Sequence, residues 1–165
     1  MNYVGIYTVM LHPAPGLPAK KDVLNLKCPH SPLRVLAVDS CPDTRESLAL
    51  LLHLWGHEVE TAPDGPAALA KADTFHPDVV ILDVAMPGFD GWELARRLRR
   101  DPVQANVHLI VVSGFGREED RQHSQEAGCE YHLLKPVDPT FLEGLLAKWQ
   151  PENSVFSPSG DGLEE

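Results

Sequence analysis

Three short apolar segments of this chain are each followed directly by a charged residue that a buried strand does not need. The segments and the residues that follow them are Arg34–Val38 with Asp39, Val79–Leu82 with Asp83, and Tyr131–Leu134 with Lys135. If these segments are parallel strands of one sheet, the three charges emerge at its carboxyl-terminal edge, where open α/β sheets bind ligands. Two carboxylates and one ammonium group at that edge would form a site for a divalent cation and a phosphoryl group.

Strand-length apolar runs alternate with segments of helical period through the middle of the chain. The predicted strands are 34–38, 57–61, 79–82, 107–112 and 131–134. A predicted helix follows each strand, and this alternation indicates a parallel sheet covered by helices on both faces. The expected fold class is α/β, doubly wound, with five strands in the order 2-1-3-4-5 and five helices. That order places the first and third strands side by side, so Asp39 should lie next to Asp83.

An aspartate precedes four of the predicted helices, where its side chain can act as the N-cap. These aspartates are Asp43, Asp64, Asp90 and Asp138. Glu46 follows Asp43 by three residues, which is an acidic variant of the capping box. In the helix after Asp90, the arginines are expected to face solvent near the helix end, where positive charge suits the helix dipole. They are Arg96, Arg97, Arg99 and Arg100.

Composition excludes several classes of protein. The chain has 165 residues, enough for one domain with a core, and a net charge of −10. Residues 33–150 carry 11 basic and 19 acidic side chains, which argues against nucleic-acid binding across the domain. No apolar run is long enough to cross a bilayer, so no membrane association is expected. The three cysteines form no CxxC pair, which argues against a disulfide frame or a zinc site and favours a cytoplasmic location.

The two ends of the chain differ in composition from its middle. Residues 1–32 contain a proline-rich stretch and are predicted to be a disordered leader. Residues 151–165 are rich in serine, proline, glycine and acidic residues, and they are predicted to be a disordered acidic tail. The predicted domain is therefore 33–150.

Residues 33–150 carry four motifs in order, each at the end of a predicted strand. They are Val38-Asp39, Asp83 with Met86-Pro87-Gly88 and Asp90-Gly91, Ser113-Gly114, and Lys135-Pro136. Together these motifs resemble the receiver domain of two-component response regulators. The resemblance implies a flavodoxin-like fold and a role in phosphorelay signalling.

The resemblance also implies an acceptor and a metal site. Asp83 would accept the phosphoryl group, and Asp39, Asp83 and the backbone carbonyl of Ala85 would hold Mg²⁺. Receivers usually carry a second acidic residue after the first strand, and here Ser40 stands at that place. A hydroxyl group carries no charge, so Ser40 would be a weak or water-mediated ligand. Weaker Mg²⁺ binding is expected, and loss of metal-dependent phosphorylation remains open.

Three further residues take roles from the resemblance. Lys135 and the Ser113 hydroxyl would each contact a phosphoryl oxygen, and His132 stands where the family often has an aromatic switch residue. The 117–127 helix is polar nearly all round, so it is expected to be held by few core contacts and to move when Ser113 engages the phosphoryl group. The output surface for a partner protein is expected within residues 117–149.

Two functions remain open at this stage. In the first, the chain accepts a phosphoryl group on Asp83 from a histidine kinase or phosphotransfer protein and switches a partner. In the second, it is a degenerate receiver that binds proteins without phosphorylation, because Ser40 weakens the metal site. No enzymatic activity of its own is expected: the residues two positions after Asp39 and Asp83 are Cys41 and Ala85, not aspartate, and no GxxxxGK[ST] loop is present. The sequence does not indicate an oligomeric state.

Overall fold

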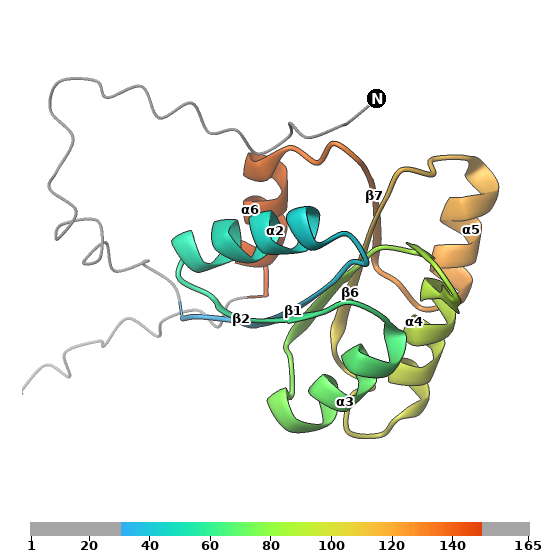
Figure 1. Cartoon of the computed structure of the whole chain (residues 1–165), viewed down its shortest axis with the longest axis horizontal. Helices are drawn as coiled ribbons and strands as arrows, with labels where there is room; N and C mark the ends of the chain where they lie inside the picture. The colour runs from blue at the N-terminus through green and yellow to red at the C-terminus, as the bar shows by residue number, and fades with distance from the viewer. Residues whose placement is uncertain (1–30, 150–165) are drawn as a thin grey trace, which may run out of the picture.

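The computed structural model describes residues 31–149, which form a five-stranded parallel sheet with helices on both faces (Figure 1). The sheet strands are β1 (Arg34–Val38), β2 (Glu58–Ala62), β3 (Val79–Leu82), β6 (His108–Ser113) and β7 (Tyr131–Leu134). Their order is β2-β1-β3-β6-β7, which confirms the predicted doubly wound topology. The predicted leader up to residue 30 and the predicted tail lie outside the described residues.

Two apolar cores separate the sheet from its helices. On one face, α2 (Pro42–Leu54) and α6 (Pro139–Ala147) cover a core that contains Leu52, Ile81 and Leu146. On the other face, α3 (Gly65–Phe75) and α4 (Gly91–Arg100) cover a second core. The α5 helix (Glu118–Glu126) packs beside β7 (Figure 1). No helix within residues 31–149 is long and apolar enough to cross a membrane.

Three of the four predicted helix caps are confirmed. Asp64, Asp90 and Asp138 each accept a hydrogen bond from a backbone N–H in the first turn of α3, α4 and α6. The prediction for Asp43 is wrong, because α2 begins at Pro42 with Cys41 at the N-cap position, two residues earlier than an Asp43 cap requires. Proline fits the first helical position because its fixed φ is already helical and no N–H is lost there.

A small hairpin between β3 and α4 was not expected from the sequence. Its strands are β4 (Ala85–Met86) and β5 (Phe89–Asp90), which pair antiparallel across Pro87 and Gly88. Gly88 has a φ of +72°, which the third position of a type II turn requires. At the following helix start, a Cβ on Gly91 would lie only 2.7 Å from the carbonyl oxygen of Asp83. This close approach requires glycine and sets α4 directly against the backbone of Asp83.

The prediction that all four α4 arginines face solvent is wrong for Arg99. Its guanidinium donates hydrogen bonds to the carbonyl oxygens of Ala105, Val107 and Gly128, and its side chain is 24% exposed. These carbonyls lie on both sides of β6, in the loop before it and in the turn before β7. Arg99 therefore ties α4 to the loop that follows it and to the turn before β7, whose Gly128 is 29 residues away in the sequence.

Replacing Arg99 with alanine is expected to lower the free energy of unfolding by about 2 kcal/mol. Hydrogen bonds to a charged donor contribute about 1.5–3 kcal/mol each, and water can replace part of this loss because the site is partly exposed. Urea unfolding measures the change. The control is Arg100→Ala on the same helix, where the side chain is exposed and a change within about 0.5 kcal/mol is expected. Equal effects of the two substitutions would contradict the assignment.

Candidate functional site

The structure brings three charged side chains together at the carboxyl-terminal edge of the sheet. Lys135 Nζ donates hydrogen bonds to Asp39 Oδ2 at 2.8 Å and to Asp83 Oδ2 at 2.7 Å. The carboxylate side chains are only 8% and 12% exposed, and that of Lys135 is 29% exposed. β1 and β3 are neighbours, with Val38 paired to Leu82, so the residue that follows each strand reaches the same place.

The second oxygen of each carboxylate is bound to the backbone nearby. Asp39 Oδ1 accepts from the Cys41 N–H at 2.8 Å, and Asp83 Oδ1 accepts from the Ala85 N–H at 2.8 Å. Each aspartate thus bonds the backbone two residues further on, which is a local turn that aspartate favours. Both side chains are held in one orientation, with their Oδ2 atoms directed to Lys135.

Lys135 is a cation at neutral pH in this environment, because its pKa is raised above the ordinary lysine value. Burial disfavours its ammonium form, but the hydrogen bonds to Asp39 and Asp83 outweigh burial and raise the pKa of Lys135 above its ordinary value. Its backbone N–H also donates to the carbonyl oxygen of Ser113 at 2.9 Å. The ends of β6 and β7 are therefore joined directly beside the charged group.

The other predicted site residues take different positions. Ser113 is fully buried at the end of β6, and its Oγ accepts from the Phe115 N–H at 3.1 Å. Within residues 31–149, no hydrogen bond joins the Ser113 hydroxyl to either carboxylate. Ser40 is half-buried directly after Asp39, and Ala85 is exposed in β4. His132 lies on β7, with Nε2 at 2.7 Å from the Phe115 carbonyl oxygen.

The donor groups at this edge fit a Mg²⁺ ion. Carboxylate oxygens of Asp39 and Asp83, the carbonyl of Ala85 and the hydroxyl of Ser40 are all hard oxygen donors, which Mg²⁺ prefers. Mg²⁺ keeps several waters and is commonly bound by one or two protein carboxylates, so two are enough. No group of three or more His, Cys, Asp or Glu side chains that could hold a metal occurs within the described part of the chain. A metal site at this edge would therefore hold only two carboxylate charges, those of Asp39 and Asp83.

Two residues that are hydrogen-bonded in series to His132 were not identified as functional from the sequence. Ser124 of α5 is 1% exposed, and its Oγ lies 2.8 Å from His132 Nδ1. Trp92 of α4 donates its indole N–H to the same Oγ at 2.9 Å. A serine in a polar helix gives no local signal, because its partners come from other elements.

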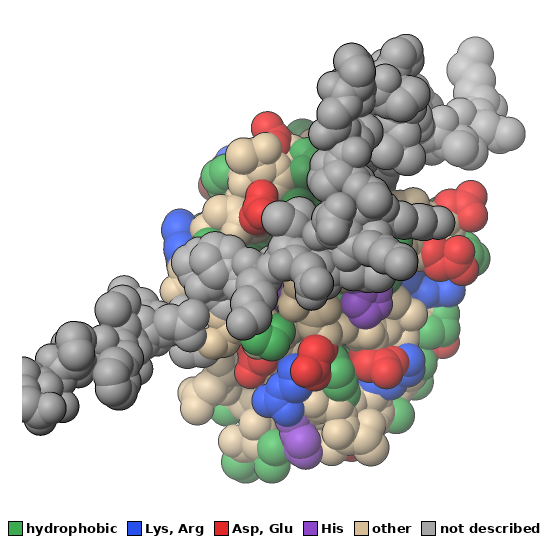
Figure 2. Space-filling view, turned by 90° about the vertical axis from the view of Figure 1, so that its left-hand side faces the viewer, with side chains coloured by type: hydrophobic (Ala, Val, Ile, Leu, Met, Phe, Trp, Pro, Cys, Tyr) green, Lys and Arg blue, Asp and Glu red, His purple; other side chains and the backbone are tan. Residues whose placement is uncertain are grey.

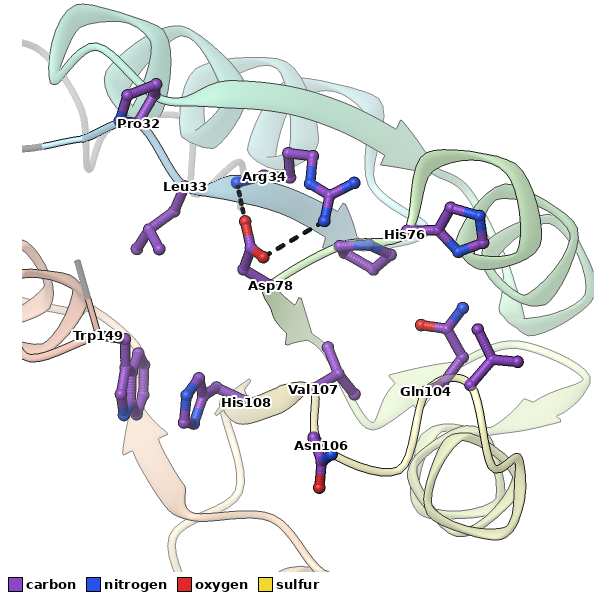
Figure 3. A pocket seen from close by; sticks show the side chains of 12 residues that line it. Pro32, Leu33, Arg34, His76, Asp78, Gln104, Asn106, Val107, His108 and Trp149 are labelled. Carbon is purple, nitrogen blue, oxygen red and sulfur yellow. Dashed lines mark hydrogen bonds and ion pairs between the residues drawn. The ribbon is translucent and has the colours of Figure 1, made fainter. Parts of the chain in front are cut away.

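A cleft of about 500 Å³ lies at the opposite edge of the sheet (Figure 3). Arg34 and His108, which open β1 and β6, line this cleft together with Asp78 and Trp149. Arg34 and Asp78 are paired with each other, as the dashed lines of Figure 3 show. Where side chains of the described residues are visible in Figure 2, acidic and basic groups lie next to one another. The cleft thus lies apart from the charged trio of Asp39, Asp83 and Lys135.

Comparisons with known proteins agree with this geometry. A family model described as the response regulator receiver domain matches residues 35–147. An uncharacterized 14.6 kDa protein of Leptolyngbya boryana is 38% identical over 70% of this chain and 88% of its own length. Response regulator PleD of Caulobacter vibrioides is 37% identical over 66% of this chain, but the match spans only 24% of PleD. Among solved structures, the chemotaxis response regulator CheY4 of Vibrio cholerae shares 33% identity, with a TM-score of 0.67, and the match covers 72% of this chain and 99% of CheY4. The chain therefore belongs to the response regulator receiver domain family, the signalling domains of two-component systems.

Proposed function

We propose that this chain is a phosphorylatable receiver, which accepts a phosphoryl group on Asp83 and thereby switches a partner protein. The observation that carries the proposal is the position of Lys135, whose ammonium group is hydrogen-bonded to both Asp39 and Asp83. A cation held against a carboxylate can neutralise the negative charge that a phosphoryl group adds there.

The phosphoryl donor would be the phosphohistidine of a histidine kinase or a phosphotransfer protein. A carboxylate oxygen of Asp83 attacks phosphorus, a P–O bond forms, the P–N bond breaks, and the leaving imidazole takes a proton from solvent. Lys135 would pair with one phosphoryl oxygen, and the Ser113 hydroxyl would donate to another. Such a transfer depends on positioning and charge neutralisation more than on further covalent chemistry. Catalysis beyond this transfer and its slow hydrolysis is not part of the proposal.

Mg²⁺ would bind the carboxylates of Asp39 and Asp83, the Ala85 carbonyl and, directly or through water, Ser40. When bound, the ion supplies positive charge that neutralises the oxygens of the incoming phosphoryl group. In the absence of the ion, Lys135 balances one of the two carboxylate charges.

Ser40→Asp is expected to lower the dissociation constant for Mg²⁺ by at least about tenfold. A unit charge about 4 Å from a cation contributes on the order of 4 kcal/mol at an effective dielectric of 20, before desolvation is subtracted. Isothermal titration calorimetry with MgCl₂ measures the constant. The control is Ser47→Asp, which adds the same charge on α2, away from the trio. An unchanged constant in Ser40→Asp would exclude Ser40 from the metal site.

A second function is supported by Ser40 itself. With two carboxylates in place of the usual three acidic groups, the chain could be a degenerate receiver that binds a partner without phosphorylation. Under either function, a protein partner would bind the surface within residues 117–149, no nucleic acid or membrane would be bound, and the protein would act in the cytoplasm.

Phosphoryl labelling separates the two functions. The chain is incubated with a radiolabelled small-molecule phosphodonor in the presence of Mg²⁺ or of a chelator. We expect label that depends on Mg²⁺ and is released by hydroxylamine, because hydroxylamine cleaves acyl phosphates. If no label is incorporated at tens of millimolar Mg²⁺, the chain is a degenerate receiver that acts without phosphorylation.

A further inference from the structure

A continuous series of hydrogen bonds runs from α4 to the turn that follows β6. The Trp92 indole N–H donates to Ser124 Oγ at 2.9 Å, and Ser124 Oγ lies 2.8 Å from His132 Nδ1. His132 Nε2 in turn lies 2.7 Å from the carbonyl oxygen of Phe115. Four residues from α4, α5, β7 and the β6–α5 turn are thus linked through three contacts.

The chemistry of these groups gives the series one direction. A carbonyl oxygen only accepts, so Nε2 of His132 must carry the proton that bonds Phe115. In the neutral ring with this tautomer, which is assigned from its partners, Nδ1 accepts from the Ser124 hydroxyl. The Ser124 oxygen is then free to accept from Trp92. Aligned bonds of this kind polarise one another, so a change at one end is felt at the other.

Ser124 also has a second acceptor within reach. Its hydroxyl lies 3.0 Å from the carbonyl oxygen of Asp120, one turn earlier in α5. A hydroxyl has one proton, so it can donate to His132 or to Asp120, but not to both. Ser124 is the one buried side chain of α5 and is 1% exposed, so water does not offer a third choice. The hydroxyl therefore has two discrete arrangements.

The far end of the series touches a residue of the proposed phosphoryl site. Ser113 Oγ accepts from the Phe115 N–H, so Ser113 and Phe115 belong to one turn. Movement of the Ser113 hydroxyl removes this bond and releases the turn whose carbonyl holds His132. The same turn is thus in contact with both the phosphoryl site and the series that reaches α4.

We propose that Ser124 is a positioning residue that, with Trp92, couples the β6–α5 turn to the α4 and α5 helices. While Phe115 holds His132, the Ser124 hydroxyl donates to His132. When Ser113 is drawn to a phosphoryl group, the Phe115 carbonyl leaves His132, and the Ser124 hydroxyl turns to Asp120. This trigger rests on the proposed function, but the hydrogen bonds that would carry the coupling are present without phosphorylation.

The first test therefore uses the unphosphorylated protein and NMR. Ser124→Ala and Trp92→Phe are expected to shift the backbone amide signals of Phe115 and Gly116, although Trp92 bonds neither residue. Trp92→Phe keeps a ring against His123, which Trp92 contacts at 5.2 Å between ring centroids, so packing is retained. The controls are Ser47→Ala on α2 and Trp149→Phe. The ring of Trp149 stacks on His108. If Trp92→Phe moves the Phe115 and Gly116 signals no more than the controls do, the coupling is refuted.

The second test uses hydrogen exchange before and after phosphorylation. The Ser124→Ala protein should take up label on Asp83 to within about twofold of wild type, yet the change of exchange in residues 118–126 should be lost. A response equal to that of wild type in labelled Ser124→Ala would overturn the proposal. If wild type takes up no label, the proposed function fails, and the NMR comparison still decides the coupling.

Discussion

Phosphoryl incorporation is expected to be abolished in Asp83→Asn and reduced, but still measurable, in Asp39→Asn. The carboxamide of asparagine has no charged oxygen to attack phosphorus, so the acceptor itself is removed in the first variant. In the second variant, the acceptor and Lys135 remain, and the proposed metal site loses one of its two carboxylate charges. The measurement is labelling with a small-molecule phosphodonor under saturating Mg²⁺.

Asp64→Asn is the matched control for both variants. Asp64 caps α3 by accepting from the Ala67 N–H at 2.8 Å, and asparagine caps helices about as well as aspartate. The control should therefore label like wild type and unfold at the same temperature. Label that persists in Asp83→Asn at the wild-type level would show that another residue is the acceptor. Equal abolition in both site variants would show that Asp39 is as necessary as the acceptor.

Lys135→Met is expected to destabilise the metal-free protein by about 3 kcal/mol, and Mg²⁺ should restore more stability to the variant than to wild type. Methionine retains an unbranched apolar chain but removes the ammonium, which leaves two nearly buried carboxylates side by side. Removing one partner of a buried ion pair costs about 3–5 kcal/mol, and the partial exposure of Lys135 reduces this figure. A divalent cation can then occupy the position between the carboxylates without competition from lysine.

Thermal unfolding in a chelator and in MgCl₂ measures both effects. Lys71→Met is the control, since Lys71 also pairs with a carboxylate, Glu60, but both side chains are well exposed. Surface pairs contribute about 0–1 kcal/mol, so neither a large loss nor a large rescue is expected there. If Mg²⁺ raises the unfolding temperature of neither protein, the carboxylates are not a metal site, and an equal rise in both would show that Lys135 does not compete with the ion.

The difference in free energy of unfolding between wild type and Lys135→Met should decrease at alkaline pH. Because folding raises the pKa of Lys135, its stabilising effect is complete below the ordinary lysine pKa of about 10.4. The effect is lost as the pH rises through the higher folded-state value. At alkaline pH, the difference in free energy of unfolding between wild type and Lys135→Met should therefore remain constant up to about pH 10 and decrease above it.

Much of the fold was accessible from local sequence patterns. β3 was predicted with its observed bounds because a strand buried on both faces is apolar throughout, and β7 was predicted equally well. Asp64, Asp90 and Asp138 were identified as caps because an N-cap bonds N–H groups two or three residues away. The chain order of strands and helices then left few topologies, and the observed one places β1 beside β3.

The convergence of Asp39, Asp83 and Lys135 follows from the same reasoning, since each residue ends a strand of one parallel sheet. Their roles in phosphoryl transfer and metal binding remain predictions. Local patterns in the chain thus predict the sheet and the residue types at its carboxyl-terminal edge. Both depend on periodicity and on neighbours within a few residues.

Which polar side chains hold the helices to the sheet depends on the tertiary structure and cannot be predicted from local sequence. Arg99 bonds Gly128, 29 residues away, and Ser124 bonds Trp92, 32 residues away. In sequence, Arg99 looks like its exposed neighbour Arg100, and Ser124 looks like any residue of a polar helix. Their partners are backbone carbonyls and ring nitrogens, which every chain contains in abundance, so no local pattern selects among them. The selection is made when the helices pack, because only then does a particular donor lie within hydrogen-bond distance of a buried acceptor.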